Sequence, residues 1–353
     1  MNQRVLASLF LISVFQGING CEKSMEDSSG FFVIDSHESD AVVWILGKKQ
    51  ANQPILEEDW KQLFSSDGYM LLKKRAGGIR RDFTDDEFKG FVLSDSLFDR
   101  FQSITTSLEK LKKIDVKGAV SRALAYLPKG TSVRIKWIYL LIKPTINSFV
   151  FMDTFTNPAI FLNVDPGAST EKFENKLVHE LFHIGYAHSF GAIAKQIFPD
   201  STLFESRFPV FEMIARLSEG LAMLAAAGGP DIHPHAVSKA DARARWDNDM
   251  RNFNSDFKRI DHFLIDVLDN KLTSDEVDQT DSSFAGYQGP WYTVGWKMAA
   301  TIEKTYGRAR LIHCISDPRI LLSTYNEAAS ISNRSHTDSL ALWSPSLIEW
   351  IAK

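Results

Sequence analysis

The pentapeptide His179-Glu180-Leu181-Phe182-His183 constrains this chain more than any other feature, because its chemistry needs an α-helix. Residues four apart on a helix lie on the same face. His179 and His183 can therefore hold one Zn²⁺ between their imidazoles. Glu180 faces the same site and can take a proton from a water that the metal activates. Chance also produces this pattern in unrelated chains, so the surrounding sequence has to decide.

The sequence around the pentapeptide predicts a helix. Asp165-Pro166-Gly167 is a turn signal, and Ser169 or Thr170 can cap a helix that starts after it. An apolar stripe then continues at spacings of four, four and three residues: Phe173, Leu177, Leu181 and Ile184. Gly185 is expected to weaken the helix just after the second histidine.

Two strand-like runs precede this helix, at residues 133–142 and 159–164. The order strand, turn, H-E-x-x-H helix is similar to the order in zincin-type proteases. In those proteases an edge strand aligns the peptide substrate by β-augmentation.

A catalytic zinc usually has three protein ligands and one open position, so a third ligand must lie outside the pentapeptide. The metzincin arrangement would need glycine at 186 and histidine at 189, but the chain has Tyr186 and Ser189 there. His188 is one residue out of register, which predicts a surface or supporting role. The third ligand therefore has to come from another element.

A later helix offers two glutamates. Phe208-Pro209 is expected to open this helix, and Gly228-Gly229-Pro230 to close it. Glu219 has apolar and small neighbours on both sides, which makes its carboxylate costly to bury without a partner such as a metal. Glu212 is seven residues earlier on the same face and is the rival ligand, or a group that holds a histidine N–H. We favour Glu219. The alternative for either residue is a solvated helix carboxylate.

The pentapeptide together with Ser218-Glu219-Gly220-Leu221-Ala222 resembles the gluzincin group of metallopeptidases. The block Gly289-Pro290-Trp291-Tyr292-x-x-Gly295, which precedes an apolar helix over residues 296–306, is similar to a segment of several gluzincin families. The resemblance implies a tyrosine hydroxyl that stabilises the oxyanion of the tetrahedral intermediate. Tyr292 is the candidate and Tyr287 the runner-up. The alternative for Tyr292 is aromatic packing at a helix start.

More closely, the chain resembles a bacterial family of zinc-dependent peptidases whose function is unknown. The matching segments, spread over most of the mature chain, are Glu58-Asp59-Trp60-x-x-Leu63, Tyr126-Leu127-Pro128 and Asn147-Ser148-Phe149-Val150-Phe151. One departure from thermolysin-like enzymes matters. Those enzymes place an Asp four residues after the ligand glutamate, and this chain has Met223 there. Either a different group orients the ligand histidine, or none does.

Other conspicuous residues are expected to have structural roles. His233 and His235 flank Pro234 in a turn, where they could supply a cationic oxyanion donor, but a solvated role is expected. Lys73-Lys74-Arg75 is a basic cluster whose default role is a solvated face. Cys314 lies in an apolar helix and is expected to belong to the core.

The N-terminus is typical of a secreted protein. Arg4 precedes an apolar stretch over residues 5–15, and Ile18-Asn19-Gly20-Cys21 resembles a bacterial lipobox. We therefore expect a signal peptide over residues 1–20, lipidation of Cys21, and a tether over residues 21–34. The protein would be lipid-anchored in the bacterial cell envelope. Asn19 stands where Ala or Ser is usual, so cleavage by the ordinary signal peptidase is the alternative.

Composition fits a soluble enzyme. The chain has 353 residues, of which 44% are apolar and 24% charged, and the net charge of −4 argues against a nucleic-acid partner. We expect an α+β fold that is mainly α. A zincin-like catalytic domain with a small sheet and an H-E-x-x-H active-site helix would occupy residues 129–353, after an N-terminal helical region over residues 35–128.

The sequence predicts a zinc-dependent peptidase that acts on a peptide or protein substrate. His179, His183 and Glu219 would bind Zn²⁺, Glu180 would act as general base, and Tyr292 would assist at the oxyanion. A non-catalytic zincin-fold lipoprotein that binds a partner is one alternative, but a structural zinc has no need of Glu180. A zinc hydrolase of a non-peptide amide is the other, and substrate profiling would separate it from a peptidase.

Overall fold

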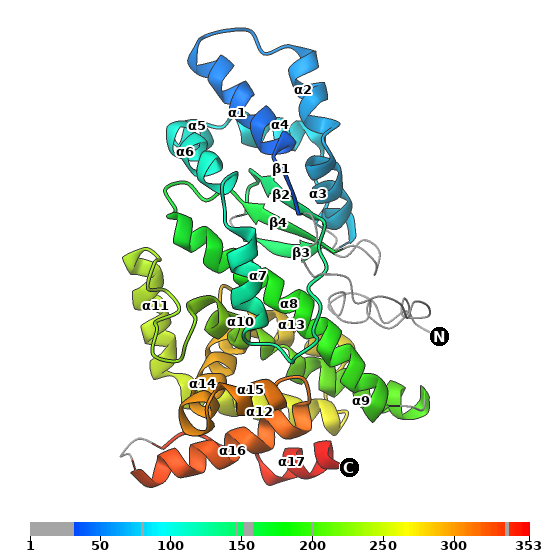
Figure 1. Ribbon diagram of the computed structural model, residues 1–353. Helices are drawn as coiled ribbons and strands as arrows, with labels where there is room; N and C mark the ends of the chain where they lie inside the picture. Colours follow the sequence, from blue (N-terminus) through cyan, green and yellow to red (C-terminus); the bar gives the residue numbers. More distant parts are fainter. Residues whose placement is uncertain (1–31, 79–80, 146, 152–157, 199–200, 336–338) are drawn as a thin grey trace. The chain divides into compact units, whose positions relative to one another are not determined.

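The computed structural model describes residues 32–78, 81–145, 147–151, 158–198, 201–335 and 339–353 (Figure 1). Its elements in chain order are β1 (Val33–Asp35), α1 (His37–Gln50), α2 (Glu57–Phe64), α3 (Asp67–Gly78), α4 (Asp85–Leu93), α5 (Asp95–Phe98), α6 (Phe101–Leu111), α7 (Val116–Leu124), β2 (Trp137–Leu141), β3 (Phe149–Phe151), β4 (Ala159–Asn163), α8 (Thr170–Ile197), α9 (Ser201–Ala215), α10 (Ser218–Ala227), α11 (Ala240–Arg251), α12 (Phe253–Leu268), α13 (Ser274–Ala285), α14 (Pro290–Tyr306), α15 (Arg308–Cys314), α16 (Pro318–Ser335) and α17 (Pro345–Ala352). This confirms the predicted α+β, mainly helical class. The predicted signal peptide and Cys21 lie outside the described residues.

The chain forms two compact units that are discontinuous in sequence. One contains the described residues up to Ala119 together with residues 134–180, and the other contains residues 120–133 and 181–353. The division into an N-terminal helical region over residues 35–128 and a catalytic domain over residues 129–353 stays a prediction. In the first unit β1 pairs with β2, which ties the N-terminal helices to the sheet.

The sheet has the order β1-β2-β4-β3. β1, β2 and β4 are parallel neighbours, and β3 runs antiparallel to β4 at one edge. Both β4 and most of β2 are buried, as expected for parallel strands that are rich in apolar residues. β2 and β4 confirm the two predicted strand-like runs in shortened form. β1 brings Val33 and Ile34, at the end of the predicted tether, into the sheet.

α8 is a 28-residue helix that contains the pentapeptide. Ser169 caps its start, because the Ser169 hydroxyl oxygen accepts a hydrogen bond of 3.1 Å from the backbone N–H of Lys172. The predicted stripe is buried, with exposures of 1% for Phe173 and 0% for Leu177 and Leu181. The helix nevertheless continues well beyond Gly185.

Gly185 allows the segment over residues 127–133 to pack closely against α8. A Cβ atom at this position would lie 2.3 Å from Leu127 Cδ1 and 3.1 Å from Thr131 Cγ2. The hydroxyls of Thr131 and Ser189, one turn further along α8, are 2.9 Å apart. The expected weakening of the helix is thus offset by a close approach of residues 127–133, which the absence of a side chain at Gly185 allows.

The helix predicted over residues 208–227 is two helices. Pro209 lies inside α9 and does not open it, and the chain breaks at Arg216 and Leu217 before α10 begins. At this break the backbone N–H groups of Arg216 and Leu217 donate to carbonyls three residues earlier, with lengths of 3.0 Å each. These are tight 3₁₀-type bonds that end one helix and start the next. Glu219 consequently lies in the first turn of α10.

α14 is a central helix of the second unit, where it packs against α10, α12, α15 and α16. Trp291, Val294 and Ile302 on this helix each have 0% exposure. Cys314, at the end of α15, is also fully buried, which confirms its predicted place in the core.

Glu38 makes the stability of the first unit depend on pH. This α1 residue is fully buried, and its Oε2 accepts a hydrogen bond of 2.9 Å from the backbone N–H of Ile142. Burial raises the pKa of Glu38 to about 8, against an opposing effect of the Lys143 charge. The folded state therefore holds a proton that the unfolded state releases, and stability should fall as the pH rises from about 4.5 to about 8.

We expect Glu38→Gln to remove this pH dependence, because glutamine resembles the protonated carboxyl and carries no charge. The variant should match the wild type at pH 4 and exceed its unfolding free energy by roughly 2 to 4 kcal/mol at pH 8. Urea unfolding at the two pH values measures this. Parallel wild-type and variant curves across the range would contradict the prediction.

Candidate metal centre

Three predicted metal ligands come together. His179 and His183 lie one turn apart on α8, and Glu219 comes from the first turn of α10. One ligand atom from each of the three residues can be chosen so that all lie within 4.8 Å of one another. Among the described residues, His179, His183 and Glu219 form a group whose ligand atoms have the spacing of a metal site.

The donor set fits Zn²⁺. Two imidazoles and one carboxylate are a ligand combination typical of catalytic zinc, which leaves a fourth position for water. The Nε2 atom of His183 lies 3.2 Å from Oε2 of Glu219. Two ligands on a tetrahedral zinc, with bonds of about 2.0–2.1 Å, are separated by about 3.3 Å. His183 is buried, whereas the Glu219 side chain is 28% exposed. The site is therefore partly buried but still accessible to solvent.

Glu180 is buried next to a group of cations. Its exposure is only 7%. Burial lowers the pKa values of Arg75, Lys143 and Lys176. The negative charge of Glu180 opposes this effect in all three cases. The pKa of Lys143 falls to about 7, with Arg75 and Lys176 adding to the effect of burial. A buried carboxylate is tolerated here because these cations compensate its charge.

Glu212 is not part of the group of three. The expectation that Glu212 and Glu219 share a helix face fails because the chain breaks between them at Arg216 and Leu217. Glu212 is buried on α9, and burial raises its pKa to about 7 against the opposing charge of Arg216. Arg216 in turn pairs with Asp281 at 3.4 Å. Glu212 therefore belongs to a separate buried network.

Tyr292 lies in the first turn of α14, which begins at Pro290 after the cap residue Gly289. The block that was expected to precede the helix is thus its start, where proline is well tolerated. A Cβ atom at Gly220 would lie 2.4 Å from the carbonyl oxygen of Tyr292, so the backbone of Tyr292 is next to the residue that follows Glu219.

Tyr287 is at the surface. It is 58% exposed, and the Arg245 guanidinium lies over its ring at 4.1 Å. The Arg245 side chain also donates a hydrogen bond of 2.8 Å to the carbonyl oxygen of Tyr287. These contacts give the runner-up tyrosine a defined structural role.

Two glycines position Glu219 against α14. A Cβ atom at Gly220 would lie 2.0 Å from the backbone nitrogen of Trp296, and one at Gly295 would lie 2.2 Å from the carbonyl oxygen of Leu217. Both contacts are with backbone, which cannot move aside as a side chain can. The start of α10 and the first turns of α14 therefore meet main chain to main chain.

We expect Gly220→Ala to destabilise the protein by roughly 2 to 4 kcal/mol, because overpacking against backbone forces the two helices apart. Zinc binding should weaken with it, since Glu219 is the preceding residue. Gly90→Ala is the matched control. Gly90 is a helical glycine in α4 whose added Cβ would meet nothing within 4 Å, so the change should stabilise by about 0.5–1 kcal/mol. Urea unfolding measures both. Equal effects of the two substitutions would show that the crossing tolerates a methyl group.

The other histidines have structural contacts. His188 is exposed on α8, as predicted. His233 pairs with Asp247 at 2.9 Å. His235 is only 6% exposed, so the expected solvated role is wrong for it. The Nδ1 atom of His235 lies 3.0 Å from the Ser238 hydroxyl, and its ring packs against Trp246 with centroids 5.3 Å apart.

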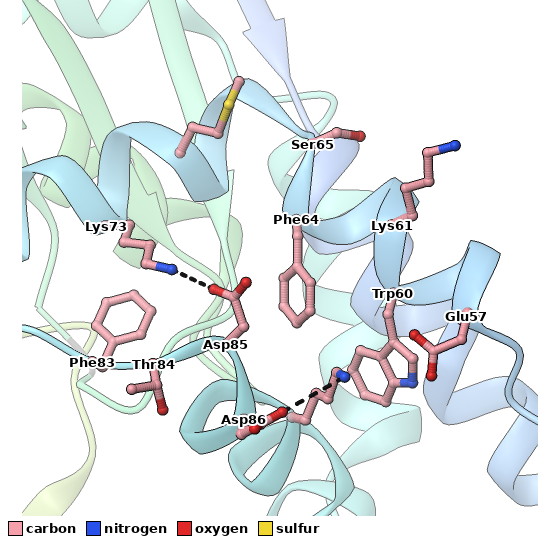
Figure 2. Close-up of a pocket in the computed structure, with 12 residues that line it drawn as sticks. Glu57, Trp60, Lys61, Phe64, Ser65, Lys73, Phe83, Thr84, Asp85 and Asp86 are labelled. Carbon is pink, nitrogen blue, oxygen red and sulfur yellow. Dashed lines mark hydrogen bonds and ion pairs between the residues drawn. The ribbon is translucent and has the colours of Figure 1, made fainter.

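A groove of about 920 Å³ lies elsewhere in the first unit, between α2, α3 and α4 (Figure 2). Two ion pairs lie within it. Lys73 binds Asp85, and Lys89 lies 3.7 Å from Asp86. Aromatic rings, including those of Trp60 and Phe64, line the rest. The groove offers an apolar surface and no set of metal ligands.

The sequence analysis missed the cations near Glu180. It treated Lys73-Lys74-Arg75 as a solvated run, and the structure confirms this for Lys73 and Lys74, which are exposed. Arg75 is half-buried, and Lys143 has only 6% exposure. The available signal for Lys143 was its position directly after the buried run Leu140-Leu141-Ile142, where a lysine is unusual.

Comparison with known proteins gives one match. A family model described as "Putative zinc dependent peptidase (DUF5700)" matches residues 46–334. The matched range includes the pentapeptide on α8, Glu219 and Tyr292. No curated protein and no solved structure shows a significant match to the chain.

Proposed function

The chain belongs to this family, and on that premise we propose that it is a zinc-dependent peptidase that hydrolyses peptide bonds with water. One observation carries the proposal. His179, His183 and Glu219 offer ligand atoms within 4.8 Å of one another, and Glu180 is the neighbour of the first ligand on the same helix. A structural zinc would need the ligands but not the glutamate.

In this proposal His179, His183 and Glu219 hold the metal. When bound, Zn²⁺ supplies a Lewis acid and lowers the pKa of a water to roughly 7. Glu180 accepts a proton as the water attacks the substrate carbonyl and delivers that proton to the leaving amine. Arg75, Lys143 and Lys176 interact electrostatically with Glu180 and offset part of the cost of burying its charge.

Tyr292 is the proposed oxyanion donor. Its position at the start of α14, with its backbone beside Gly220, supports a place near the ligand that precedes this glycine. A phenol hydroxyl there would donate a hydrogen bond to the developing negative charge of the tetrahedral intermediate.

The proposed architecture is zincin-like. Support comes from the edge strand β3, which is antiparallel to β4, and from the short connection that leads from β4 to α8. We propose that an extended peptide adds to β3, the last strand in the sheet order, by backbone hydrogen bonds, which would align it for cleavage.

Metal analysis combined with a peptide-library cleavage assay tests the function. The purified mature chain should contain about one zinc per molecule and should cleave peptides in a metal-dependent way. Zinc without cleavage of any peptide would favour the non-catalytic binding protein. Cleavage of small amides but not of peptides would favour a hydrolase of non-peptide amides. A chain that binds no zinc would exclude both zinc enzymes.

We also propose that Cys21 is lipidated and anchors the protein to the bacterial cell envelope, as the lipobox-like segment indicates. Within the part of the chain that the structure describes, no helix has the length and apolar character needed to cross a membrane. Mass spectrometry of the mature N-terminus should find an acylated Cys21, and Cys21→Ser should release the protein from membranes or leave it uncleaved. An unmodified Cys21, or a different first residue, would exclude the anchor.

A further inference from the structure

Arg75 is held over the edge strand of the sheet. It lies on α3, which packs against β2 in the same unit (Figure 1). The central carbon of its guanidinium group is 3.7 Å from the centroid of the Phe149 ring, and Phe149 is the first residue of β3. A guanidinium stacked on an aromatic face keeps the N–H groups at its rim directed outward, where they can bind a planar anion.

Arg75 has no acid of its own to bind. Across the residues that the structure describes, no carboxylate lies within 4.0 Å of its guanidinium and no hydrogen bond is formed by its side chain. Burial lowers the pKa of Arg75, and the charge of Arg81 lowers it further. The charge of Glu180 opposes both effects. A half-buried guanidinium without a direct partner is costly, and an anion supplied from outside the chain would lower that cost.

The neighbouring lysines are already engaged. The ammonium of Lys143 donates to the carbonyl oxygen of Thr145 at 2.6 Å, to the Thr145 hydroxyl at 2.8 Å and to Asn147 Oδ1 at 2.9 Å. These three bonds use all its hydrogens and hold the segment that leads into β3. Lys176 lies 3.4 Å from Asp165. Both lysines thus have partners of their own, while Arg75 keeps its donors available.

We propose, on the basis of the proposed peptidase function, that Arg75 binds a carboxylate of the peptide substrate beside the edge strand β3. The carboxylate could be the C-terminal α-carboxylate or the side chain of an Asp or Glu, and the chemistry of recognition is the same for both. A bidentate Arg–carboxylate pair gives orientation as well as affinity. Arg75 and Glu180 lie in the same compact unit and interact electrostatically, so we expect the bound carboxylate near the scissile bond.

Matched peptides built on one sequence that the library identifies as cleaved test this assignment. One pair differs only in a free or amidated C-terminus, and further pairs differ only in Glu or Gln at positions flanking the scissile bond. The enzymes compared are the wild type, Arg75→Gln, Arg75→Lys and Lys74→Gln. Lys74 directly precedes Arg75 on the same helix and is exposed, so its variant loses the same charge outside the proposed subsite.

We expect the wild type to prefer one carboxylate-bearing peptide by roughly 10- to 100-fold in kcat/KM, mainly through KM. Arg75→Gln should bring this ratio close to 1, Arg75→Lys should keep part of it, and Lys74→Gln should keep all of it. The pair that shows the preference identifies the C-terminal or the side-chain carboxylate. Thermal unfolding of each variant separates loss of recognition from loss of fold.

Two results would overturn the assignment while the peptidase function stands. The wild type could cleave both members of every pair equally well, or Arg75→Gln could slow both members equally. Failure of the wild type to cleave any peptide would instead remove the proposed function, and the assignment would fall with it.

Discussion

Glu180→Gln should leave the zinc content and the fold intact while lowering kcat by roughly 10²- to 10⁴-fold. Glutamine keeps the size and the hydrogen-bonding capacity of the buried side chain, but it can neither accept a proton from water nor deliver one to the leaving amine. The loss should therefore appear in kcat and in kcat/KM together, with little change in substrate binding.

Steady-state kinetics on one cleaved peptide, with metal analysis of the same preparation, measures this. Glu171→Gln is the matched control, because Glu171 lies in the first turn of the same helix and is exposed. It should behave as the wild type. An active wild type whose rate survives Glu180→Gln would rule out this residue as the proton carrier.

His183→Ala should lose most of the bound zinc. His183 is buried, its Nε2 lies 3.2 Å from Oε2 of Glu219, and alanine leaves two ligands where three are needed. Glu219→Ala should also weaken zinc binding, by much more than Glu212→Ala, because Glu212 lies on α9 before the break in the chain.

Zinc content after dialysis against a weak chelator, normalised to folded protein by circular dichroism, compares the three variants. The normalisation matters for Glu212→Ala, which removes a buried carboxyl and can change stability by itself. If Glu212→Ala loses more zinc than Glu219→Ala, the assignment of the third ligand is wrong.

Local signals allowed α8 to be predicted. The turn at Asp165, the cap at Ser169 and the apolar stripe through Leu177 and Leu181 all act within α8, and each has its expected place. The two central strands were also recognisable, because parallel strands buried on both faces are continuous apolar runs. The candidate ligands followed from the same logic, since a spacing of four residues on a helix fixes two of them.

The remaining features depend on contacts between distant residues. β1 has only three residues and pairs with a strand about a hundred positions later, so no local pattern reveals it. The break at Arg216 and Leu217 contains neither glycine nor proline, whereas Pro209, which suggested a helix start, lies inside α9. Tertiary packing overrides local preference at both places.

Arg75 likewise could not be identified from the sequence alone. Three consecutive basic residues have the same sequence signal, and only one of them is half-buried and stacked on a ring. The distinction arises from the pairing of β3 with β4, which brings Phe149 to the sheet edge. Charge patterning in the sequence cannot select that residue.

The contact between Gly220 and Gly295 limits how this centre can diversify. Where two main chains touch, no side chain remains whose size could be altered to move Glu219 toward or away from α14. In the proposed peptidase, variation in the substrate that is cleaved would then have to arise at the sheet edge and in the loops, with Glu219 held at a constant position. Anyone redesigning the metal preference would accordingly gain more by changing the identity of the ligands than by repacking this crossing.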